Sequence, residues 1–568
     1  MIWFLENPER SKRERLELEQ LVGSVDWLVP IGWRMDSSRL SWDADIIVGE
    51  QVFPITLRYP NHFPFSPPRV LPRGDQSRWS FHQYGAGGEL CLEYGPDNWH
   101  EDITGAEMVR SAHRLLLGEA ISSMGGPDVP SRHRSSLGEH LSGKRSRFFF
   151  DQETQAILSA LVDDQVVAAT TITQFHEHAS VRFLASAEVG DPGWKASLPT
   201  SLVNESFERA TALIRWPEAL PLPPDSSAKT MCAAIAKRGI EIGLAELFVL
   251  VHGLDICIYQ LDHENDSVRT ITVILEQEKQ PRLDPAHEAL KERRVAIIGC
   301  GSVGSKIAIM LARSGVSRFA LVDEDIFLPE NLARNELDWR DVALHKVDAL
   351  ARKVQLVNPK ATCDRYRRML GGQGSAGAIE GLIEVLEQCD LLIDASADNS
   401  AFEVLSAVAS FGKRTVVWGQ VFAGGIGGFV ARSRPGQEPN PAIMRRKVEA
   451  WCAEKGRIIS PASAPYEGGE SAPVVANDAD VSVITSHLAA LAVDTLIPRI
   501  PSSYRHAVYL IGLKADWIFD QAFEVHPIDV GPPTEPVFEP FNADNAKAEL
   551  LEILKRLAEH PNAATNES

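Results

Sequence analysis

One segment constrains the fold of this chain more than any other. Residues 294–323 read RVAIIGCGSVGSKIAIMLARSGVSRFALVD. The pattern predicts a buried strand over 295–298, a glycine-rich turn, a helix over 305–314 and a second strand over 319–322. Because a strand, a glycine turn, a helix and a strand in this order form a βαβ unit, we expect a parallel sheet with helices on its faces.

The glycine turn has the spacing of a nucleotide-binding loop. Gly299, Gly301 and Gly304 occupy the three glycine positions of G-x-G-x-x-G, where the missing side chain lets the backbone approach a phosphate. Asp323 ends the second strand, 24 residues after Gly299, at the place where an acidic side chain accepts a hydrogen bond from a ribose hydroxyl. Taken alone, this pattern favours an NAD-dependent oxidoreductase.

The residues that follow favour ATP instead. The stretch DEDIFLPENLARN places Asp325, Asn331, Arg334 and Asn335 close together, and Lys346 follows twelve residues after Arg334. Hydride transfer needs no such cluster of charged and amide side chains. Arginine and lysine hold a polyphosphate and stabilise the charge that develops during in-line attack at the α-phosphate.

A third predicted strand, which runs into Asp394, also leads into carboxylates. The segment CDLLIDASADNSAFEVL predicts a buried strand that runs into Asp394, with Asp398 and Asn399 just beyond it. The carboxyl ends of strands in an α/β sheet face the ligand crevice, so we assign Asp398 to Mg²⁺ bound with the nucleotide. The alternative is an ordinary cap for the helix that follows.

These motifs together resemble the superfamily of ThiF, MoeB and the ubiquitin-activating enzymes, over about residues 285–535. The resemblance implies ATP-dependent adenylation of the C-terminal carboxylate of a protein, by a homodimer. It implies that Asp323 holds the ribose, that Asn331, Arg334 and Lys346 hold the phosphates, and that Asp398 holds the metal. Two features depart from the family: the zinc-binding cysteines of ThiF and MoeB are missing, and asparagine replaces the more common glutamine at position 335.

Length and composition bound the remaining possibilities. A chain of 568 residues predicts three or four domains, which we place at 1–145, 146–284, 285–536 and 537–568. The net charge of −20 argues against nucleic acid as a partner. Seven scattered cysteines without a C-x-x-C pair favour a reducing compartment over a structural zinc site. We find no signal peptide or membrane-spanning stretch, so we expect no membrane and a cytoplasmic location.

The N-terminal region raises the question of whether Cys91 is a packing residue or a nucleophile. Its surroundings, RYPNHFPFSPPRVL and WSFHQYGAGGELCLEYGPDNW followed by the helical ITGAEMVRSAHRLL, resemble the ubiquitin-conjugating enzymes over most of residues 1–145. That resemblance implies that Cys91 carries its cargo as a thioester. The His-Pro-Asn of the family is here His82-Gln83-Tyr84, so the asparagine thought to stabilise the oxyanion is absent. We expect His82 to be structural and a backbone N–H near Gly87 or Gly88 to replace the asparagine.

Ubiquitin-activating enzymes often use a cysteine of their own on a loop that crosses over the nucleotide site. In the corresponding residues of this chain, 416–494, Cys452 is the only thiol. It lies in the predicted helix AIMRRKVEAWCAEKG, downstream of Arg445, Arg446 and Lys447, which would favour the thiolate. We therefore name Cys452 as a catalytic candidate. The alternatives are a packing residue beside Trp451 and direct transfer of the adenylate to Cys91.

The fold class expected from all of this is a multidomain α/β chain. It comprises an N-terminal α+β domain like the ubiquitin-conjugating enzymes, an α+β linker domain, and a C-terminal Rossmann-like adenylation domain of the ThiF type. This order resembles the fused enzymes of bacterial cyclic-oligonucleotide anti-phage signalling (CBASS) operons. In those operons the fused enzyme attaches the C-terminus of a cGAS-like nucleotidyltransferase to a target amine.

The expected reaction is ATP·Mg²⁺-dependent adenylation, transfer to Cys452 or directly to Cys91, and acyl transfer to an amine. One alternative keeps this chemistry with a bacterial ubiquitin-like protein as cargo. Another is an adenylyltransferase for sulfur transfer, in which the N-terminal domain is reduced to a binding module. A third, the NAD-dependent oxidoreductase, is disfavoured by the phosphate-binding cluster.

Overall fold

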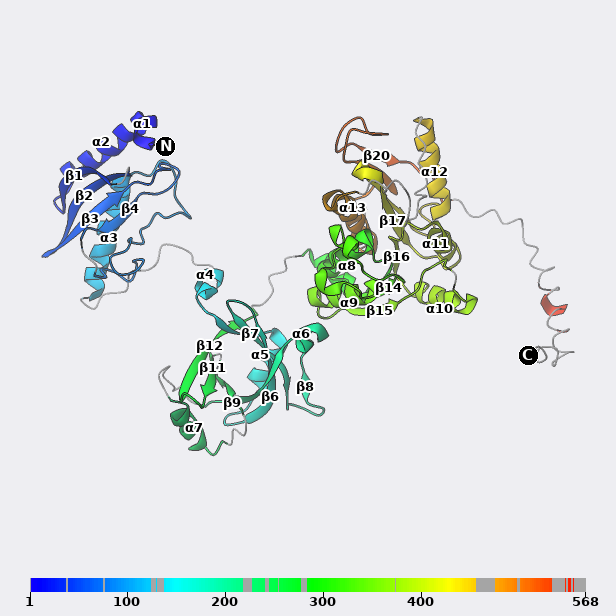
Figure 1. The fold of residues 1–568 in the computed structure, drawn as a ribbon, viewed down its shortest axis with the longest axis horizontal. Coiled ribbons are helices and arrows are strands. Elements are labelled where there is room, and N and C mark those ends of the chain that lie inside the picture. Colours follow the sequence, from blue (N-terminus) through cyan, green and yellow to red (C-terminus); the bar gives the residue numbers. More distant parts are fainter. Residues whose placement is uncertain are drawn as a thin grey trace. The chain divides into compact units, whose positions relative to one another are not determined.

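The computed structural model describes residues 2–36, 39–74, 77–123, 137–217, 227–240, 245–253, 255–276, 283–372, 374–455, 476–497, 501–533 and a few isolated positions. The chain forms two compact units, Met1–Lys144 and Arg145–Ser568. The second unit contains two separate sheets (Figure 1). For the last region, 537–568, the sequence AKAELLEILKRLAEH predicts a helix over 546–560 followed by a polar tail, and both lie almost entirely outside the described residues.

The N-terminal unit is an antiparallel sheet in the order β1-β2-β3-β4 with helices before and after it (Figure 1). Inward residues of all four strands pack with α2 and α3 in one core, because alternate residues of a half-buried strand face the same side. The elements are α1 (Trp3–Glu6), α2 (Pro8–Ser24), β1 (Leu28–Asp36), β2 (Arg39–Val48), β3 (Gln51–Arg58), β4 (Arg69–Pro72), α3 (Gly105–Ser123) and α4 (Leu137–Ser142).

The middle of the chain is a closed ring of strands, which the expectation of an α+β linker did not specify. Its strand order is β5-β12-β11-β10-β9-β6-β7-β8, and β5 also pairs with β7, so seven strands close into a ring and β8 pairs with β7 outside it. The elements are β5 (Ser146–Phe150), α5 (Gln152–Ala160), β6 (Val166–Phe175), β7 (Ser180–Ala187), β8 (Trp194–Lys195), α6 (Thr200–Asn204), β9 (Phe207–Arg215), α7 (Ala228–Ala236), β10 (Leu247–His252), β11 (Asp255–Asp262) and β12 (Ser267–Leu275).

The C-terminal sheet has the order β15-β14-β13-β16-β17-β18-β19-β20. The pairs from β15 to β17 are parallel and those from β17 to β20 are antiparallel. The elements are η1 (Pro285–Glu292), β13 (Arg294–Ile298), α8 (Ser302–Ser314), β14 (Arg318–Val322), η2 (Pro329–Ala333), η3 (Trp339–Asp341), α9 (Lys346–Val357), β15 (Thr362–Tyr366), α10 (Ala376–Leu386), β16 (Leu391–Asp394), α11 (Asn399–Phe411), β17 (Val416–Val421), η4 (Ala423–Gly425), β18 (Gly427–Ser433), α12 (Pro441–Glu454), α13 (Asp478–Leu496), β19 (Val508–Gly512) and β20 (Val525–Ile528).

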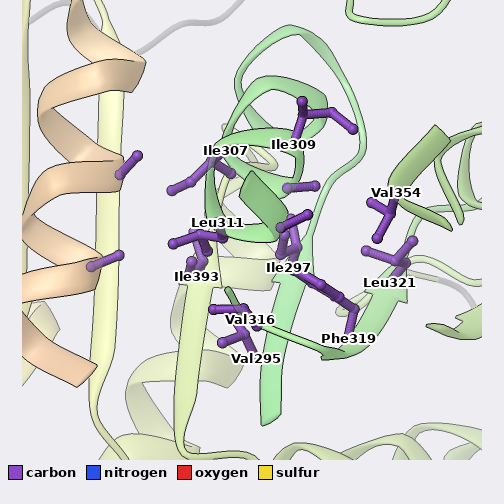
Figure 2. Close-up of a cluster of buried hydrophobic side chains, with 14 of the residues drawn as sticks. Val295, Ile297, Ile307, Ile309, Leu311, Val316, Phe319, Leu321, Val354 and Ile393 are labelled. Carbon is purple, nitrogen blue, oxygen red and sulfur yellow. The ribbon is translucent and has the colours of Figure 1, made fainter. Parts of the chain in front are cut away.

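Helices cover both faces of this sheet, as the βαβ pattern predicts. Residues of α8, α9 and α13 pack on one face and residues of α10, α11 and α12 on the other. In Figure 2, Leu311 of α8 lies beside Ile393 of β16, and both side chains are fully buried. The α8 helix begins at Ser302, three residues earlier than predicted, because Gly301 serves as its N-cap.

One helix among the described residues, α13, is long and apolar enough to cross a membrane by length and composition alone. In this fold it lies against α8, β17 and β18, and half of its most apolar window is buried. Its apolar character therefore follows from its place in the core of the C-terminal sheet.

A buried carboxylate joins three elements of the N-terminal unit. Glu14 of α2 is fully buried and accepts hydrogen bonds from the Tyr59 hydroxyl and the Gly105 N–H, each at 2.7 Å, and from Arg10 Nε at 3.0 Å. Burial raises the pKa of the Glu14 carboxyl, and the hydrogen bonds from Tyr59 and Gly105 and the charge of Arg10 oppose that rise. Glu14 thus fixes α2 against the end of β3 and the start of α3.

We expect Glu14→Ala to lower the free energy of unfolding of the N-terminal unit by about 3–5 kcal/mol, because it leaves a buried arginine without its carboxylate. Glu19→Ala changes an exposed residue of the same helix and serves as the control. Hydrogen–deuterium exchange of the full chain reports the loss as faster exchange in 8–24 and 105–123. Equal protection of these segments in the two variants would contradict the assignment.

Candidate active site

The strand order of the C-terminal sheet has a topological switch point at β13. From β13 the chain passes through α8 to β14 on one side, and it later returns to the other side of β13 in β16. In open α/β sheets, ligands bind in the crevice outside the carboxyl ends of strands at such a point. The sequence-predicted residues follow these strands: Gly299, Gly301 and Gly304 after β13, Asp323, Asp325, Asn331, Arg334 and Lys346 after β14, and Asp398 after β16.

The three glycines have different structural roles. Gly299 has φ +86°, and a Cβ there would lie 2.7 Å from Ser396 Cα, so the loops after β13 and β16 touch. A Cβ on Gly304 would overlap the carbonyl oxygen of Gly299. A Cβ on Gly301 would meet nothing within 4 Å. Gly301 therefore borders open space at the N-terminus of α8, where backbone N–H groups favour an anionic ligand.

Asp323 organises the glycine loop. Its Oδ2 accepts from the Cys300 N–H at 2.6 Å and its Oδ1 accepts from the Asp325 N–H at 2.8 Å. Burial raises the pKa of the Asp323 carboxyl, whereas these two N–H groups lower it. The predicted contact of Asp323 with a ribose stays a prediction.

The segment after Asp323 folds back on itself and ends in a largely buried lysine. Lys346 Nζ lies 2.8 Å from Asp325 Oδ2, and the Lys346 N–H donates to the Asp325 carbonyl oxygen at 3.0 Å. Asn331 Oδ1 accepts from the Leu328 N–H at 3.0 Å and so stabilises the start of η2. The partly buried Arg334 ends η2. The charge of Lys346 also opposes the rise in the pKa of the Asp323 carboxyl, so this lysine lies near the end of β14.

Asn335 also contacts the glycine loop, because its Nδ2 donates to the Cys300 carbonyl oxygen at 3.3 Å. This side chain and Asp323 therefore hold the same loop residue from two directions, one through its carbonyl and one through its N–H. The replacement of glutamine by asparagine at this position is compatible with that contact.

Two carboxylates lie at the end of β16. Asp394 is buried and accepts from Ser396 N–H and Oγ at 3.0 and 2.6 Å, and burial raises its pKa. Asp398 accepts from the Ala401 N–H at 2.8 Å and caps α11. Among the described residues no group of three or more His, Cys, Asp and Glu side chains could hold a metal. One or two carboxylates with substrate phosphates are what Mg²⁺ usually takes, so this pair fits that ion.

Lys306 was missed by the sequence analysis. It lies in the second turn of α8, is 3% exposed, and its Nζ is 2.8 Å from Asp478 Oδ1 and 3.4 Å from Glu336 Oε1. Its position two residues after the third glycine was the available signal. Its partner Asp478, at the start of α13, is distant in sequence and only the fold brings them together.

The cationic surroundings expected for Cys452 are not what the structure shows. Cys452 is fully buried in the core under α12, and burial raises the pKa of its thiol to about 11, with the Glu449 charge adding to the rise. Arg445 lies 2.8 Å from Asn399 Oδ1, and Lys447 donates to the Val530 carbonyl oxygen. The structure therefore favours the packing alternative for Cys452.

Cys91 has a more open setting. It is partly exposed, and its N–H donates to the His82 carbonyl oxygen at 2.8 Å. An antiparallel bridge pairs Gln83 with Leu90, so His82–Tyr84 and 89–91 run side by side. His82 Nε2 lies 2.7 Å from the Val129 carbonyl oxygen, which fits its expected structural role.

The predicted oxyanion donors near Cys91 are already engaged. The Gly87 N–H donates to the Ser77 carbonyl oxygen at 3.1 Å and the Gly88 N–H to the Gly85 carbonyl oxygen at 3.2 Å. These two N–H groups therefore have partners in this structure, and the expectation that a backbone N–H near them replaces the missing asparagine stays a prediction. The charge of Cys91, when ionised, is the largest cause that raises the pKa of the nearby Tyr84 hydroxyl.

Comparisons with known proteins bear on the C-terminal half. The profile described as ThiF family matches residues 277–567. The uncharacterized protein y4qC of Sinorhizobium fredii is 25% identical over 374 residues, which cover 60% of this chain and 63% of y4qC. The ATP-dependent ubiquitin transferase-like protein Cap2 of Pseudomonas aeruginosa is 28% identical over 120 residues, 20% of each chain. The chain thus spans less than two thirds of the length of either relative.

A solved structure of MccB from E. coli with AMPCPP and MccA is 16% identical, with a TM-score of 0.33 over 44% of this chain and 67% of MccB.

We expect iodoacetamide at pH 7.5 to modify Cys91 at least about 100-fold faster than Cys452. The thiolate is the reacting form, and a thiol with a pKa of about 11 has only about one molecule in 3,000 ionised at that pH. Labelling of Cys452 should rise as the pH approaches 11. Timed peptide mapping by mass spectrometry measures both rates, and equal rates at pH 7.5 would place Cys452 outside the core.

Proposed function

Because the chain belongs to the ThiF family, we propose that its C-terminal half uses ATP to adenylate the C-terminal carboxylate of a protein. The observation that carries this proposal is the crevice at the end of β13. There, open space at Gly301 meets the N-terminus of α8, and Lys346 and Arg334 follow on the next loop. A helix N-terminus with two cations nearby suits a polyphosphate.

In the proposed first step, a carboxylate oxygen of the cargo attacks the α-phosphorus of ATP. A new P–O bond forms, the bond to the bridging oxygen breaks, and pyrophosphate leaves. Asn331, Arg334 and Lys346 would bind the phosphates, and Asp323 would position the ribose. Asp398 would hold Mg²⁺, and Asp394 lies close by at the end of β16. The ion neutralises phosphate charge when bound.

In the proposed second step, the Cys91 thiol attacks the acyl carbon of the adenylate. A C–S bond forms, the C–O bond to the phosphate breaks, and AMP leaves while the thiol gives up its proton. An amine of the target then attacks the thioester, and Cys91 is released as a thiol. The partial exposure of Cys91 supports this role, because a carrier thiol has to meet both adenylate and amine.

We propose direct transfer to Cys91 rather than passage through Cys452. The burial of Cys452 and the raised pKa of its thiol support this route, since a buried neutral thiol is a poor nucleophile. Having both reacting halves on one chain raises the effective concentration of Cys91 at the adenylate.

The cargo is proposed to be the flexible C-terminal tail of a cGAS-like nucleotidyltransferase in bacterial anti-phage defence. Similarity to Cap2, named an ATP-dependent ubiquitin transferase-like protein, supports protein transfer of this kind. A bacterial ubiquitin-like protein is the second candidate, with the same steps. The chain is proposed to act as a homodimer in the cytoplasm.

We expect Lys346→Met to weaken ATP binding by about 10- to 100-fold, because a hydrogen bond to a charged group contributes about 1.5–3 kcal/mol. Lys291→Met, an exposed position on η1, should bind ATP as the unchanged chain does. Isothermal titration of the full chain with ATP and Mg²⁺ gives the affinities. Binding of NAD with no binding of ATP would favour the oxidoreductase alternative and overturn the proposal.

We expect Cys91→Ser to convert the acyl adduct from a thioester into a stable ester, since the hydroxyl replaces the sulfur at the same place. The chain would be co-expressed with candidate proteins that end in glycine or alanine, and adducts mapped by mass spectrometry. Cys452→Ser is the matched control and should still carry a thioester on Cys91. If Cys91→Ala kept the full activity of the unchanged chain, that result would instead favour the sulfur-transfer alternative.

A further inference from the structure

The interior of the closed strand ring in the middle of the chain is apolar toward one end and polar toward the other. Side chains alternate along a strand, so every second residue of each strand faces into the ring. Over most of its length these residues form one apolar core, which includes Leu213 and Val249. Toward the end where β5, β7 and β9 begin, the inward residues are polar: Ser146, Thr173, Arg182, Arg209, Thr211 and Gln260.

Arg182 of β7 is a buried cation whose hydrogen-bond partners are all neutral. Its side chain is buried, and its Nη1 donates to the hydroxyls of Ser146 at 2.8 Å and Ser180 at 3.1 Å. Its Nη2 donates to Gln260 Oε1 at 3.0 Å. Burial, and then the charge of Arg209, lower the pKa of the Arg182 guanidinium to about 10. A buried charge without an opposite charge is costly to fold, so an anion beside Arg182 would stabilise this end of the ring.

Three buried polar atoms beside Arg182 have no hydrogen-bond partner in the part of the chain that the structure describes. They are Arg182 Nε, Thr173 Oγ1 and Arg209 Nε. Thr173 of β6 lies directly opposite Arg182, and Arg209 of β9 is a diagonal neighbour of Thr173. Arg209 also forms an ion pair with Glu246, so its charge is compensated and that of Arg182 is not. Buried donors are almost always paired in native proteins, so three unpaired donors on adjacent strands indicate a ligand that completes them.

Two exposed aromatic side chains lie at the same end of the ring. Phe175 of β6 and Phe207 of β9 are 57% and 65% exposed, and their rings pack edge to face with centroids 5.5 Å apart. Phe175 is two residues from Thr173 and Phe207 is two residues from Arg209, so the rings are on the same face of the sheet as the polar atoms. Binding sites for small organic molecules combine apolar and aromatic surface with a few polar groups in this way.

We propose that the polar end of the ring binds an organic oxyanion, a carboxylate or a phosphate that carries an apolar group. The oxyanion accepts hydrogen bonds from Arg182, Arg209 and Thr173, and guanidinium groups are well suited to carboxylate and phosphate oxygens. The rings of Phe175 and Phe207 contact the apolar group. The proposal does not rest on the adenylation chemistry, because none of these residues belongs to the C-terminal sheet.

The first experiment is isothermal titration of the full chain with benzoate and, separately, with phenyl phosphate, in a chloride buffer without other oxyanions. We expect at least one of the two anions to bind. Tighter binding of benzoate would assign a carboxylate as the ligand, and tighter binding of phenyl phosphate a phosphate ester. Benzamide has the same ring without the charge and should not bind. No binding of either anion, or equal binding of benzamide, would overturn the proposal.

We expect Arg182→Met to weaken binding of the preferred anion by about 10- to 100-fold, because it removes a hydrogen bond between charged groups. Arg147→Met is the matched control and should leave the affinity unchanged, because Arg147 lies between two inward residues of β5 and so is on the outer face of the ring. Full affinity in Arg182→Met, with loss of binding in Lys346→Met, would place the anion at the nucleotide site and overturn the proposal.

Thr173→Val is a second variant, since Arg182→Met also leaves its three neutral partners without a donor. Valine has nearly the shape of threonine, and the Thr173 hydroxyl has no partner among the described residues, so the substitution should leave the unliganded chain as stable as before. We expect it to weaken anion binding by about 2- to 10-fold, the contribution of one neutral hydrogen bond. Hydrogen–deuterium exchange over 166–187 and 207–215 reports whether the ring is intact. An intact ring with unchanged affinity in Thr173→Val would remove the Thr173 hydroxyl from the site and overturn the proposed geometry.

Discussion

The close approach of two loops, one after β13 and one after β16, sets the geometry of the candidate nucleotide site. Gly299 makes the approach possible, because any side chain there would overlap the backbone at Ala395 and Ser396. Asp323 then ties the same loop to the end of β14 through the Cys300 N–H. The ends of β13, β14 and β16 are thus held together by the absence of a Cβ at Gly299 and by the Asp323 carboxylate. Of the three glycines, only Gly301 borders open space. Gly301 is therefore the residue of the motif with room beside it, whereas Gly299 and Gly304 make close backbone contacts.

Burial decides which thiols of this chain are available for chemistry. Cys300, Cys389 and Cys452 are fully buried, and burial raises the pKa of each. Cys91 is partly exposed on a short strand-like step. Arg445 and Lys447 do not stabilise a Cys452 thiolate, because their side chains have other partners and the apolar core penalises the charge. The difference between the two candidates is therefore one of packing more than of charge.

Local pattern predicted what local interactions determine. The strand at 295–298, the glycine turn and the second strand at 319–322 were predicted within a residue, since their periodicity and turn residues lie in one short segment. The start of α8 was three residues off, because a glycine rather than a polar side chain caps it. The role of Cys452 could have been predicted better: Met444, Val448 and Cys452 repeat every four residues and share the apolar face of α12. The pairing of Gln83 with Leu90 beside Cys91, and the ion pair of Lys306 with Asp478, depend on how separate segments dock, which no local pattern contains.

The closed ring in the middle of the chain has a consequence for biosynthesis. Its first strand, β5, pairs with its last, β12, through residues as distant in sequence as Arg147 and Thr272. While only the earlier strands have been synthesised, the nascent chain therefore exposes the unpaired edge of β10 or β11. Such edges can pair with strands of other chains. The loop that must close is long, so closure is slow in comparison with the local hairpins that flank it. The rate of translation through 255–275 sets how long the growing chain stays exposed to that misassembly.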